Sequence, residues 1–564
     1  MNDALHRVIG IDLGTTYSAV AAFNDEDLTP EILIDTAAEG AGAATPSVVL
    51  RDPKSGQAVV GHAAKDAMAS ASDDAEIIIE IKREMGAEFD ARLLDQYRAG
   101  AEFSVGDPVR VRFGAEWLRP QEVSALVLLK MKSIAEDGLG GELRDAVVTV
   151  PAYFTERQKR ATEEAALLAG LYPRQLIPEP TAAAICYGVD RADSGRHVYL
   201  VYDMGGGTFD VSIIETHETS IEVIATAGDY RLGGGDIDAA IVDWLTAGLG
   251  LSEKPAVGRL ALRAIAEKAK RALSYADVVP VVVPGHPALD LTRARFEELI
   301  AGLLARSIAE VEKALQFARE KGVERADIDA ILLVGGSTKV PRVKRALLEH
   351  FDRQESFVRS DGNPDTLVAR GAALQARRFA PSENFDLAVR PAADQTTDEE
   401  DELQVTLITE HTLGVSTITG EFFRLLDVGS KIPATRTRSL WNPHMATGVV
   451  IGVYQGEQPF YADNELIGEI VIDEIEPLPE FTHEFQITFT LTIDGLLQVD
   501  VYHVNTEKRY EGSYDHRTHI GRVSELAERR ARLLEIAAVD RSSAPGPISA
   551  LPAPDELPDI GLPS

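Results

Sequence analysis

One short pattern occurs twice in this chain and constrains its fold more than any other feature. Residues 9–23 read IGIDLGTTYSAVAAF and residues 198–214 read VYLVYDMGGGTFDVSII. In each, an apolar run ends in an aspartate (Asp12 or Asp203), turns through glycine and threonine, and resumes as a second apolar run. The repetition predicts two related lobes, each of which contributes one such turn to a cleft between them.

The residues of the two turns suit a polyphosphate. Glycines allow consecutive backbone N–H groups to approach an anion closely, and threonines add hydroxyl donors. A carboxylate beside a phosphate is repulsive unless a cation separates them, so Asp12 and Asp203 predict Mg²⁺ held through water. A glycine hairpin would explain either turn alone, but not readily the pair with its two aspartates. The other turn residues are Gly14, Thr15, Thr16, Gly205, Gly206, Gly207 and Thr208.

Two further segments carry residues that suit a nucleoside, although each has an ordinary alternative. Residues 332–343, LLVGGSTKVPRV, place two glycines between a buried strand and a helix, which fits a loop around a base or a plain turn. Residues 267–274, EKAKRALS, place charged side chains three and four positions apart on one helix face. On the residues alone, a solvated charged face is the simpler explanation of that spacing.

The charge of the chain argues against some partners. Its 564 residues include 90 Asp and Glu against 56 Lys and Arg, a formal net charge of −34, which opposes binding to nucleic acid or to an anionic membrane. The single cysteine, Cys186, lies in AAAICYG and fits a packing role. No signal pattern and no apolar run of about 18 residues occurs, so we expect a cytoplasmic protein.

The pattern of the chain changes near residue 380. Before it, short β-branched runs alternate with helical stretches, which predicts α/β layers. An acidic stretch with Asp398–Glu402 then predicts a solvated hinge. Beyond it, alternating segments and the turn pair Asp494-Gly495 predict an antiparallel β domain to about residue 512. One amphipathic helix follows, and a proline-rich tail ends the chain; the apolar stripe of that helix is Val523, Leu526, Leu533, Leu534 and Ala537.

Taken together, these segments resemble the seventy-kilodalton heat-shock chaperones, the DnaK-like family, from about residue 7 to residue 512. Specific markers are IGIDLGTTYSAV, VVTVPAYFTERQKRAT, EPTAAAICYG, DMGGGTFDVSII, GDYRLGGGDID and VGGSTKVPRV, in the family's order. The resemblance implies a bilobed actin-like α/β ATPase domain followed by an antiparallel β-sandwich and a short C-terminal helix. The implied segments are an ATPase domain (1–385), a linker (386–408), a peptide-binding β-sandwich (409–512), a helical remnant of the lid (513–540) and a disordered tail (541–564).

The resemblance also implies roles for individual residues. Lys82 matches the lysine that orients the attacking water, and Thr208 matches a hydroxyl near the γ-phosphate. Mg²⁺ would be held by Asp12 and Asp203, with K⁺ as a further candidate cation. The implied catalytic residues are Lys82, Glu179, Asp203, Thr208 and Asp210. The implied ATP/ADP-binding residues are Asp12, Gly14, Thr15, Thr16, Tyr17, Gly205, Gly206, Gly207, Thr208, Gly234, Glu267, Lys270, Arg271, Ser274, Gly335, Gly336, Ser337, Lys339, Val340 and Asp365.

Several positions depart from the family pattern. The linker ELQVTLITEHTLG is less apolar than usual, although Leu403, Val405 and Leu407 alternate so that it can still extend a sheet edge. One helix replaces the helical bundle of the lid. Lysine replaces arginine at Lys159, which together with Pro151 would relay the nucleotide state to the second domain. The other departures are Pro178 for asparagine, Gly235 for glutamate and Lys339 for arginine.

We weigh three functions. The leading one is an ATP-hydrolysing chaperone that switches affinity for extended hydrophobic peptides of unfolded proteins, served by a J-domain co-chaperone and a nucleotide exchange factor. The second is an ATP-binding interaction module with weak or no hydrolysis that recruits a dedicated partner. The third is a sugar kinase on the same fold, for which the β domain would have no purpose.

Overall fold

The computed structural model describes most of the ATPase-like region, the β region and one C-terminal helix. It describes residues 6–36, 42–71, 75–100, 102–189, 195–217, 220–251, 258–360, 363–387, 404–492, 497–511 and 523–537. The predicted hinge, the turn at Asp494-Gly495 and the predicted tail lie outside these ranges. No helix within them is long and apolar enough to cross a membrane.

The first lobe is built on a sheet of the order β11-β10-β1-β2-β3, in which β4 also pairs with β2. Strands β1, β2 and β3 form an antiparallel meander, and β10 and β11 join β1 in parallel. Helices α3 and α4 pack together beside this sheet. The bounds are β1 Val8–Asp12, β2 Tyr17–Asn24, β3 Thr29–Leu33, β4 Thr45–Pro46, β10 Asp145–Val150, β11 Tyr172–Pro178, α3 Pro120–Leu139 and α4 Glu156–Leu168.

Smaller elements complete this lobe, and one of them, the short helix η1, carries Lys82. Helix α2 begins after Asp90, whose side chain accepts a hydrogen bond from the backbone N–H of Leu93, as an N-cap does. The bounds are β5 Val49–Arg51, β6 Ala58–Val60, α1 His62–Met68, β7 Ile77–Ile78, η1 Ile81–Glu84, α2 Ala91–Gln96, β8 Val111–Phe113 and β9 Glu116–Leu118.

The second lobe repeats the topology of the first. Its sheet runs β18-β17-β12-β13-β14, again an antiparallel meander of three strands with two parallel strands beside the first of them. The relation between lobes that the repeated turn predicts is therefore confirmed. The bounds are β12 Arg196–Met204, β13 Phe209–His217, β14 Ser220–Asp229, β15 Val278–Val281, β16 Leu289–Thr292, β17 Ala330–Val334, β18 Val358–Arg359, α6 Gly234–Leu249, α7 Arg259–Leu273, α8 Arg293–Glu320, η3 Gly336–Lys339 and α9 Pro341–Phe351.

Two helices meet where the lobes join. Helix α10 (Leu367–Ala376) packs on the first sheet, while α5 (Glu179–Val189) packs against β12 and β13 of the second. They approach so closely that a Cβ atom at Gly371 would lie 1.7 Å from the carbonyl oxygen of Ala182. On the other face of α10, a Cβ at Gly10 of β1 would lie 2.1 Å from the backbone nitrogen of Ala373. Glycine is required at both positions because a side chain has no room.

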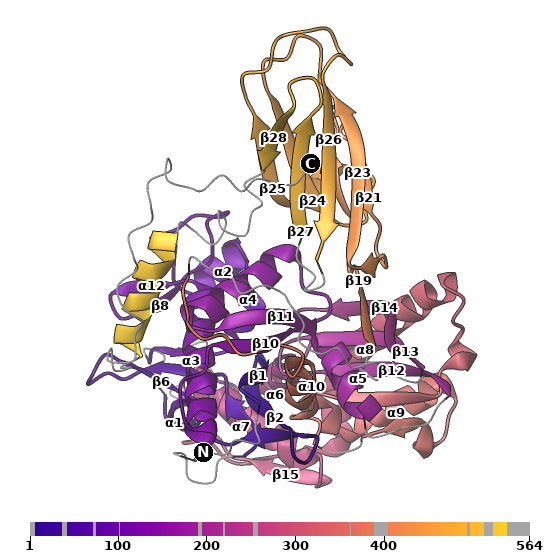
Figure 1. The fold of residues 1–564 in the computed structure, drawn as a ribbon. Helices are drawn as coiled ribbons and strands as arrows, with labels where there is room; N and C mark the ends of the chain where they lie inside the picture. The colour runs from indigo at the N-terminus through magenta and orange to yellow at the C-terminus, as the bar shows by residue number, and fades with distance from the viewer. Residues whose placement is uncertain are drawn as a thin grey trace.

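The strands from β20 to β28 stand on the two lobes as a β-sandwich (Figure 1). Its sheets have the orders β21-β20-β24-β25 and β23-β26-β27-β28, all antiparallel. In β26 and β27 alternate residues are buried, as the period-two pattern predicts. The bounds are β20 Leu413–Ser416, β21 Phe422–Leu426, β22 Lys431–Ile432, β23 Ala434–Trp441, β24 Val449–Gln455, β25 Glu465–Ile472, β26 Glu484–Leu491, β27 Leu497–His503 and β28 Lys508–Glu511.

The described part of the predicted linker is a strand of the second lobe's sheet. Strand β19 (Gln404–Ile408) lies parallel to β14 and antiparallel to β22, so it extends the edge of the sheet into the β-sandwich. Leu407 and Ile408 are 6% and 5% exposed and belong to one hydrophobic cluster that includes residues of the two lobes and of the β-sandwich. The expectation that the linker can still join a sheet edge is confirmed despite Thr406.

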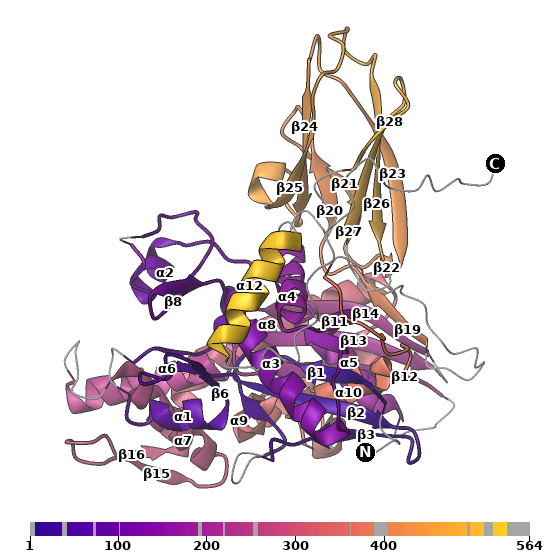
Figure 2. The ribbon, with the colours of Figure 1, turned by 60° about the vertical axis from the view of Figure 1, so that its left-hand side comes forward.

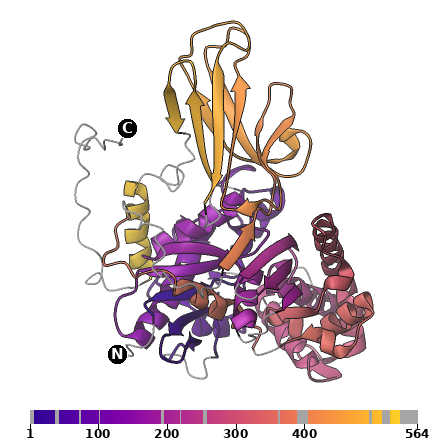
Figure 3. The same cartoon turned by 45° about the vertical axis from the view of Figure 1, so that its right-hand side comes forward.

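The C-terminal helix α12 (Val523–Ile536) packs on the first lobe, beside α3 and α4 and apart from the β-sandwich (Figures 2 and 3). Leu526 and Leu533, from the predicted apolar stripe, are buried in the core of that lobe. Arg529 donates to Glu122 at 3.1 Å and also pairs with Glu164. The apolar face of this helix is therefore occupied by the ATPase-like region.

Candidate functional site

The two glycine-threonine turns face each other across the cleft. A Cβ atom built at Gly206 would lie 1.8 Å from the hydroxyl oxygen of Thr16, and one at Gly207 would lie 2.3 Å from the methyl carbon of Thr15. The turn between β1 and β2 is fixed by Ser18, whose hydroxyl accepts from the N–H of Gly14 at 3.2 Å. A cradle that small residues alone can line is thus formed by one turn from each lobe.

Strand register places the acidic side chains beside these turns. Asp12 is the last residue of β1, and Asp203 stands directly opposite Asp210 in the pairing of β12 with β13. The hydroxyl of Thr149 donates to Asp12 at 3.2 Å, and the backbone N–H of Tyr153 donates to Asp210 at 3.0 Å. Because each of these acids lies at or near the end of a buried strand, the strand ends bring the acids into one buried cluster.

Lys82 reaches this cluster from η1. Its ammonium group donates to the backbone carbonyl of Leu13 and to the carboxylate of Glu179, both at 2.5 Å, and its side chain is 3% exposed. Glu179 begins α5, where a carboxylate also favours the helix dipole. One buried cation therefore stands among four acids, which leaves an excess of negative charge.

The excess charge shows in the acidity of the carboxyl groups. Burial, with a further contribution from Glu179, raises the pKa of Asp12 to about 7. Burial and Glu179 likewise raise the pKa of Asp210 to about 8, and burial with the neighbouring acids raises the pKa of Asp203 well above its usual range. A bound cation would remove this penalty, so the site fits a divalent ion.

The donor set also indicates how such an ion would be held. Within the described ranges, no three His, Cys, Asp or Glu side chains converge as direct ligands of one metal. Mg²⁺ usually keeps several waters and takes one or two carboxylates together with phosphate oxygens. Asp12 and Asp203, next to the turn cradle, fit a hydrated ion of that kind.

The predicted nucleoside residues converge at the second lobe. Ser337 donates to the carbonyl of Gly205 at 2.7 Å, and Lys270 donates to the carbonyl of Gly234 at 3.0 Å. A Cβ at Gly335 would lie 2.7 Å from Asp203, and one at Gly336 would lie 2.7 Å from Asp365. These contacts join the loop at η3, the start of α6 and the turn after β12.

The remaining nucleoside residues differ in how they face the cleft. Tyr17 donates to Glu267 at 3.3 Å and accepts from Arg271 at 3.3 Å, which links the lobes. Lys339 pairs with Asp365 at 2.5 Å in a partly exposed position. Ser274 is the C-cap of α7, whereas the Val340 side chain is buried in the hydrophobic core of the second lobe, so only the backbone of Val340 is available to a ligand.

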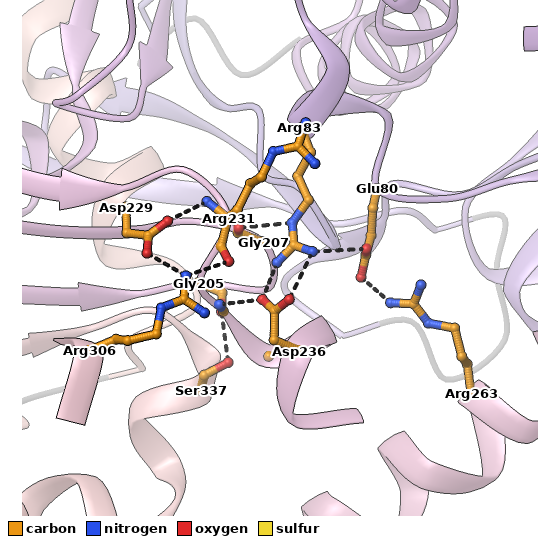
Figure 4. Close-up of polar contacts among 12 residues, drawn as sticks. Glu80, Arg83, Gly205, Gly207, Asp229, Arg231, Asp236, Arg263, Arg306 and Ser337 are labelled. Atoms are coloured by element: carbon orange, nitrogen blue, oxygen red, sulfur yellow. Dashed lines mark hydrogen bonds and ion pairs between the residues drawn. The ribbon is translucent and has the colours of Figure 1, made fainter. Parts of the chain in front are cut away.

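Several contacts across the cleft were missed by the sequence interpretation. Arg83 donates to the carbonyl of Gly207 at 2.9 Å and pairs with Asp236, and Glu80 pairs with Arg263 (Figure 4). Lys65 pairs with Glu267 at 2.7 Å. Charged residues of short or amphipathic helices read as solvated positions, and the sequence alone does not indicate that their partners lie in the other lobe.

The seam between the ATPase-like region and the β-sandwich contains buried charge. Lys159 pairs with Glu410 at 2.9 Å and with Glu156 at 3.4 Å. His411 lies 4.5 Å from Tyr153, centroid to centroid, and its Nε2 atom is buried without a hydrogen-bond partner. Although burial lowers it, the two carboxylates raise the pKa of Lys159 above its usual value. Pro151 lies two residues before Tyr153, where β10 leads into α4.

The β-sandwich exposes apolar side chains. Trp441, Met445 and Phe481 are 47%, 50% and 70% exposed, and hydrogen bonds involving the 442, 445 and 481 backbones hold their loops together. Ile418 is 81% exposed in the loop between β20 and β21. Exposed apolar side chains that gather in one patch mark a surface for apolar ligands, so these residues are candidates for such contacts.

The first domain has two lobes, whose glycine turns face each other over buried acids. A sheet strand joins it to a β-sandwich with exposed apolar loops. Together these features define a two-domain nucleotide-dependent protein. Comparison with known proteins gives the family. The family model described as "Hsp70 protein" matches residues 8–531. Among curated relatives, Chaperone protein DnaK of Thermosipho melanesiensis is 36% identical over 525 residues, covering 90% of this chain and 80% of the relative.

Chaperone protein DnaK of Thermotoga petrophila and that of Thermotoga maritima are each 37% identical over 519 residues, with 89% of this chain and 79% of the relative covered. The chain therefore belongs to the Hsp70 family. It is an ATP-dependent chaperone and an ATPase, which does not favour the alternative of an interaction module without hydrolysis.

Proposed function

We propose that the cleft hydrolyses ATP through the buried cluster around Lys82. Lys82 orients the attacking water, and Asp210 and Glu179 accept hydrogen bonds from that water. The hydroxyl of Thr208 donates a hydrogen bond near the γ-phosphate. The two backbone turns hold the phosphate oxygens. The observation that supports these roles is the contact between the turns at Gly206 and Thr16, because it requires a cradle shared by both lobes.

Mg²⁺ would be held through water by Asp12 and Asp203, where it supplies positive charge next to the phosphates. The raised pKa values of these two acids support this assignment, because burial and neighbouring acids destabilise each carboxylate in its charged form and a nearby cation would offset that cost. K⁺ remains a second candidate for the same acidic cluster. The protein itself contributes fixed positions and a buried environment, in which charge interactions are strong.

We propose that nucleotide state reaches the β-sandwich through the seam at β10, α4 and β19. Tyr153, whose N–H bonds to Asp210, also contacts His411 of the second domain, so one residue touches both the acid cluster and the seam. Pro151 and Lys159 lie on the same connection. The β-sandwich binds extended hydrophobic segments of unfolded proteins, and a shift in domain docking would change its affinity for them.

We further propose that a J-domain co-chaperone and a nucleotide exchange factor act on this protein, and that it works in the cytoplasm. We propose the domain limits given by the sequence, with the ATPase domain at 1–385 and the peptide-binding domain at 409–512. The position of α12 on the first lobe supports a β-sandwich that holds peptide without a helical cover.

The test is ATP turnover of the full chain with and without a model unfolded peptide, in the wild type and in Lys82→Ala. Peptide-stimulated turnover that falls about 10²-fold or more in the variant supports the assignment. Lys313→Ala, at an exposed position of α8, is the matched control and keeps wild-type turnover. Tight ATP binding without any turnover in the wild type would contradict it, as would phosphoryl transfer to a small hydroxyl compound.

A further inference from the structure

A carboxylate of the first lobe is seated against a glycine of the second at the mouth of the cleft. Glu80, just before η1, has a backbone φ of 55°, a left-handed conformation that is unfavourable for a residue other than glycine. Its carboxylate lies between Arg83 of its own lobe, at 3.5 Å, and Arg263 of α7 in the facing lobe (Figure 4). The surrounding contacts therefore hold Glu80 in a strained but defined place.

The glycine is needed for space. A Cβ atom at Gly235 would lie 2.1 Å from Oε1 of Glu80 and 2.9 Å from a guanidinium nitrogen of Arg263. Gly235 does not have a positive φ, so its backbone alone does not require glycine. A side chain at position 235 would displace the pair of Glu80 and Arg263 from the cleft.

This pair lies directly over the candidate nucleotide pocket. Glu80 and Arg263 line one pocket together with Thr15 and Thr16 on the phosphate side and Glu267 on the nucleoside side. The N–H of Gly235 donates to the carbonyl of Gly206 at 2.7 Å, so the seat of Glu80 is bonded directly to the phosphate turn. Opening the lobes would separate Glu80 from Arg263 while the pocket becomes accessible.

We propose that Glu80 is a positioning residue that clamps the lobes through Arg263 and sets the rate at which ADP leaves the cleft. The inference rests on the proposed nucleotide site and adds to it a residue that sets nucleotide exchange. The side chains of Glu80 and Arg263 are 16% and 29% exposed, so salt screens their attraction. The pair should therefore hold the lobes together around a bound nucleotide more tightly at low ionic strength. Arg83 supports Glu80 from its own lobe.

The experiment measures dissociation of fluorescently labelled ADP from the full chain by stopped flow. Glu80→Gln and Arg263→Gln should each speed release about 10-fold, because truncating one partner of such a pair acts mainly on dissociation. The double variant should release no faster than either single variant. Raising salt should speed release from the wild type but not from the variants. Glu298→Gln, in an exposed pair on α8, is the control and keeps wild-type release.

A steric variant tests the seat. Gly235→Ala should speed release in the wild-type background but add little in a Glu80→Ala background, where the displaced carboxylate is already absent. Two results would overturn the clamp if the wild type binds ADP normally. One is that the effects of the two glutamine substitutions on release add. The other is that Glu80→Gln slows single-turnover hydrolysis and leaves ADP release unchanged. If the wild type itself bound no nucleotide, the site assignment would fail instead, so the two failures are distinguishable.

Discussion

Two elements near opposite ends of the C-terminal region, strand β19 and helix α12, are attached to the ATPase-like region by different chemistry. Strand β19 is attached through backbone hydrogen bonds to β14 and through the buried side chains of Leu407 and Ile408. Helix α12 is attached through two leucines and through Arg529, which is shared between Glu122 and Glu164. Backbone pairing tolerates many side chains, whereas a buried ion cluster fails when one member is lost.

The two attachments should therefore respond differently to substitution and to pH. A strand at a sheet edge loses stability in proportion to the apolar surface removed. A helix held by buried charge loses a large amount at one position and little at its neighbours.

Arg529→Met should detach α12. The substitution leaves Glu164 buried without its cation, at a side-chain exposure of 8%, whereas Glu122 keeps its pair with Arg532; the loss costs about 3–5 kcal/mol. Hydrogen exchange should then show α12 amide protection falling by about 10²- to 10³-fold, with β19 unchanged. Glu528→Ala, exposed on the same helix, is the control. Unchanged protection in Arg529→Met would mean that the leucines alone hold the helix.

Leu407→Ala should weaken the strand attachment by about 2–5 kcal/mol, as for other buried leucines. The loss should appear as faster exchange of the β19 amides and as greater separation of two fluorophores placed on the first lobe and the β-sandwich. Thr406→Ala, at a half-buried neighbouring position, should have a small effect. Equal effects of the two substitutions would show that backbone pairing, and not apolar burial, determines docking.

Acidification should loosen the seam through His411. Burial and the neighbouring Lys159 lower the pKa of His411 to about 4, from its ordinary value near 6.5. The docked state therefore favours the neutral ring, so docking is fully supported above pH 6.5 and is lost as pH falls towards 4. At pH 5 the docking constant should be about 30-fold lower for this group alone.

Glu410 opposes this dependence, because burial raises its pKa and docking then favours its protonated form. Tyr153 and Lys159 also face the ring, but neither changes charge between pH 4 and 7. The measurement is therefore interdomain fluorescence transfer from pH 7 to 5 in the wild type and in His411→Leu. A pH dependence that stays the same in the variant would exclude His411 as its source.

The surface pair of Lys431 and Glu222 should matter least. It lies beside β19, at 2.8 Å, but its side chains are 64% and 37% exposed. Lys431→Ala should change docking by no more than about 0.5 kcal/mol, and less at high salt. A change in the fluorescence measurement as large as that of Leu407→Ala would show that exposed charge contributes as much to this seam as buried leucine does.

The sequence predicted the strand attachment but not the helix attachment, for a physical reason. Alternating apolar residues indicate which face of a strand is buried, and the only kind of partner that extends such a strand is the edge of a sheet. The apolar stripe of Leu526 and Leu533 indicates that one face of α12 is buried, but it does not indicate which part of the molecule covers that face. Glu122 and Glu164, which pair with Arg529, read as solvent-facing residues of two other helices.

The same limit applied at the cleft. The two glycine turns could be predicted to face each other because they repeat one pattern, and the two sheets do share one topology. Glu80 and Arg263 could not be paired, because nothing in either segment indicates the other. The one available signal was Gly235, where a glycine replaces the glutamate usual in the family and leaves space for a carboxylate from elsewhere.

The glycines at the base of the lobes have a mechanical consequence. At Gly10 and Gly371 the chain passes within a side-chain's width of Ala373 and Ala182, so α5 and α10 lie backbone against backbone. Surfaces in such contact cannot slide past each other without colliding, whereas they can turn about the point of contact. The cleft should consequently open and close by rotation of the lobes about this contact, so that a small rotation there produces a large displacement at the mouth of the cleft.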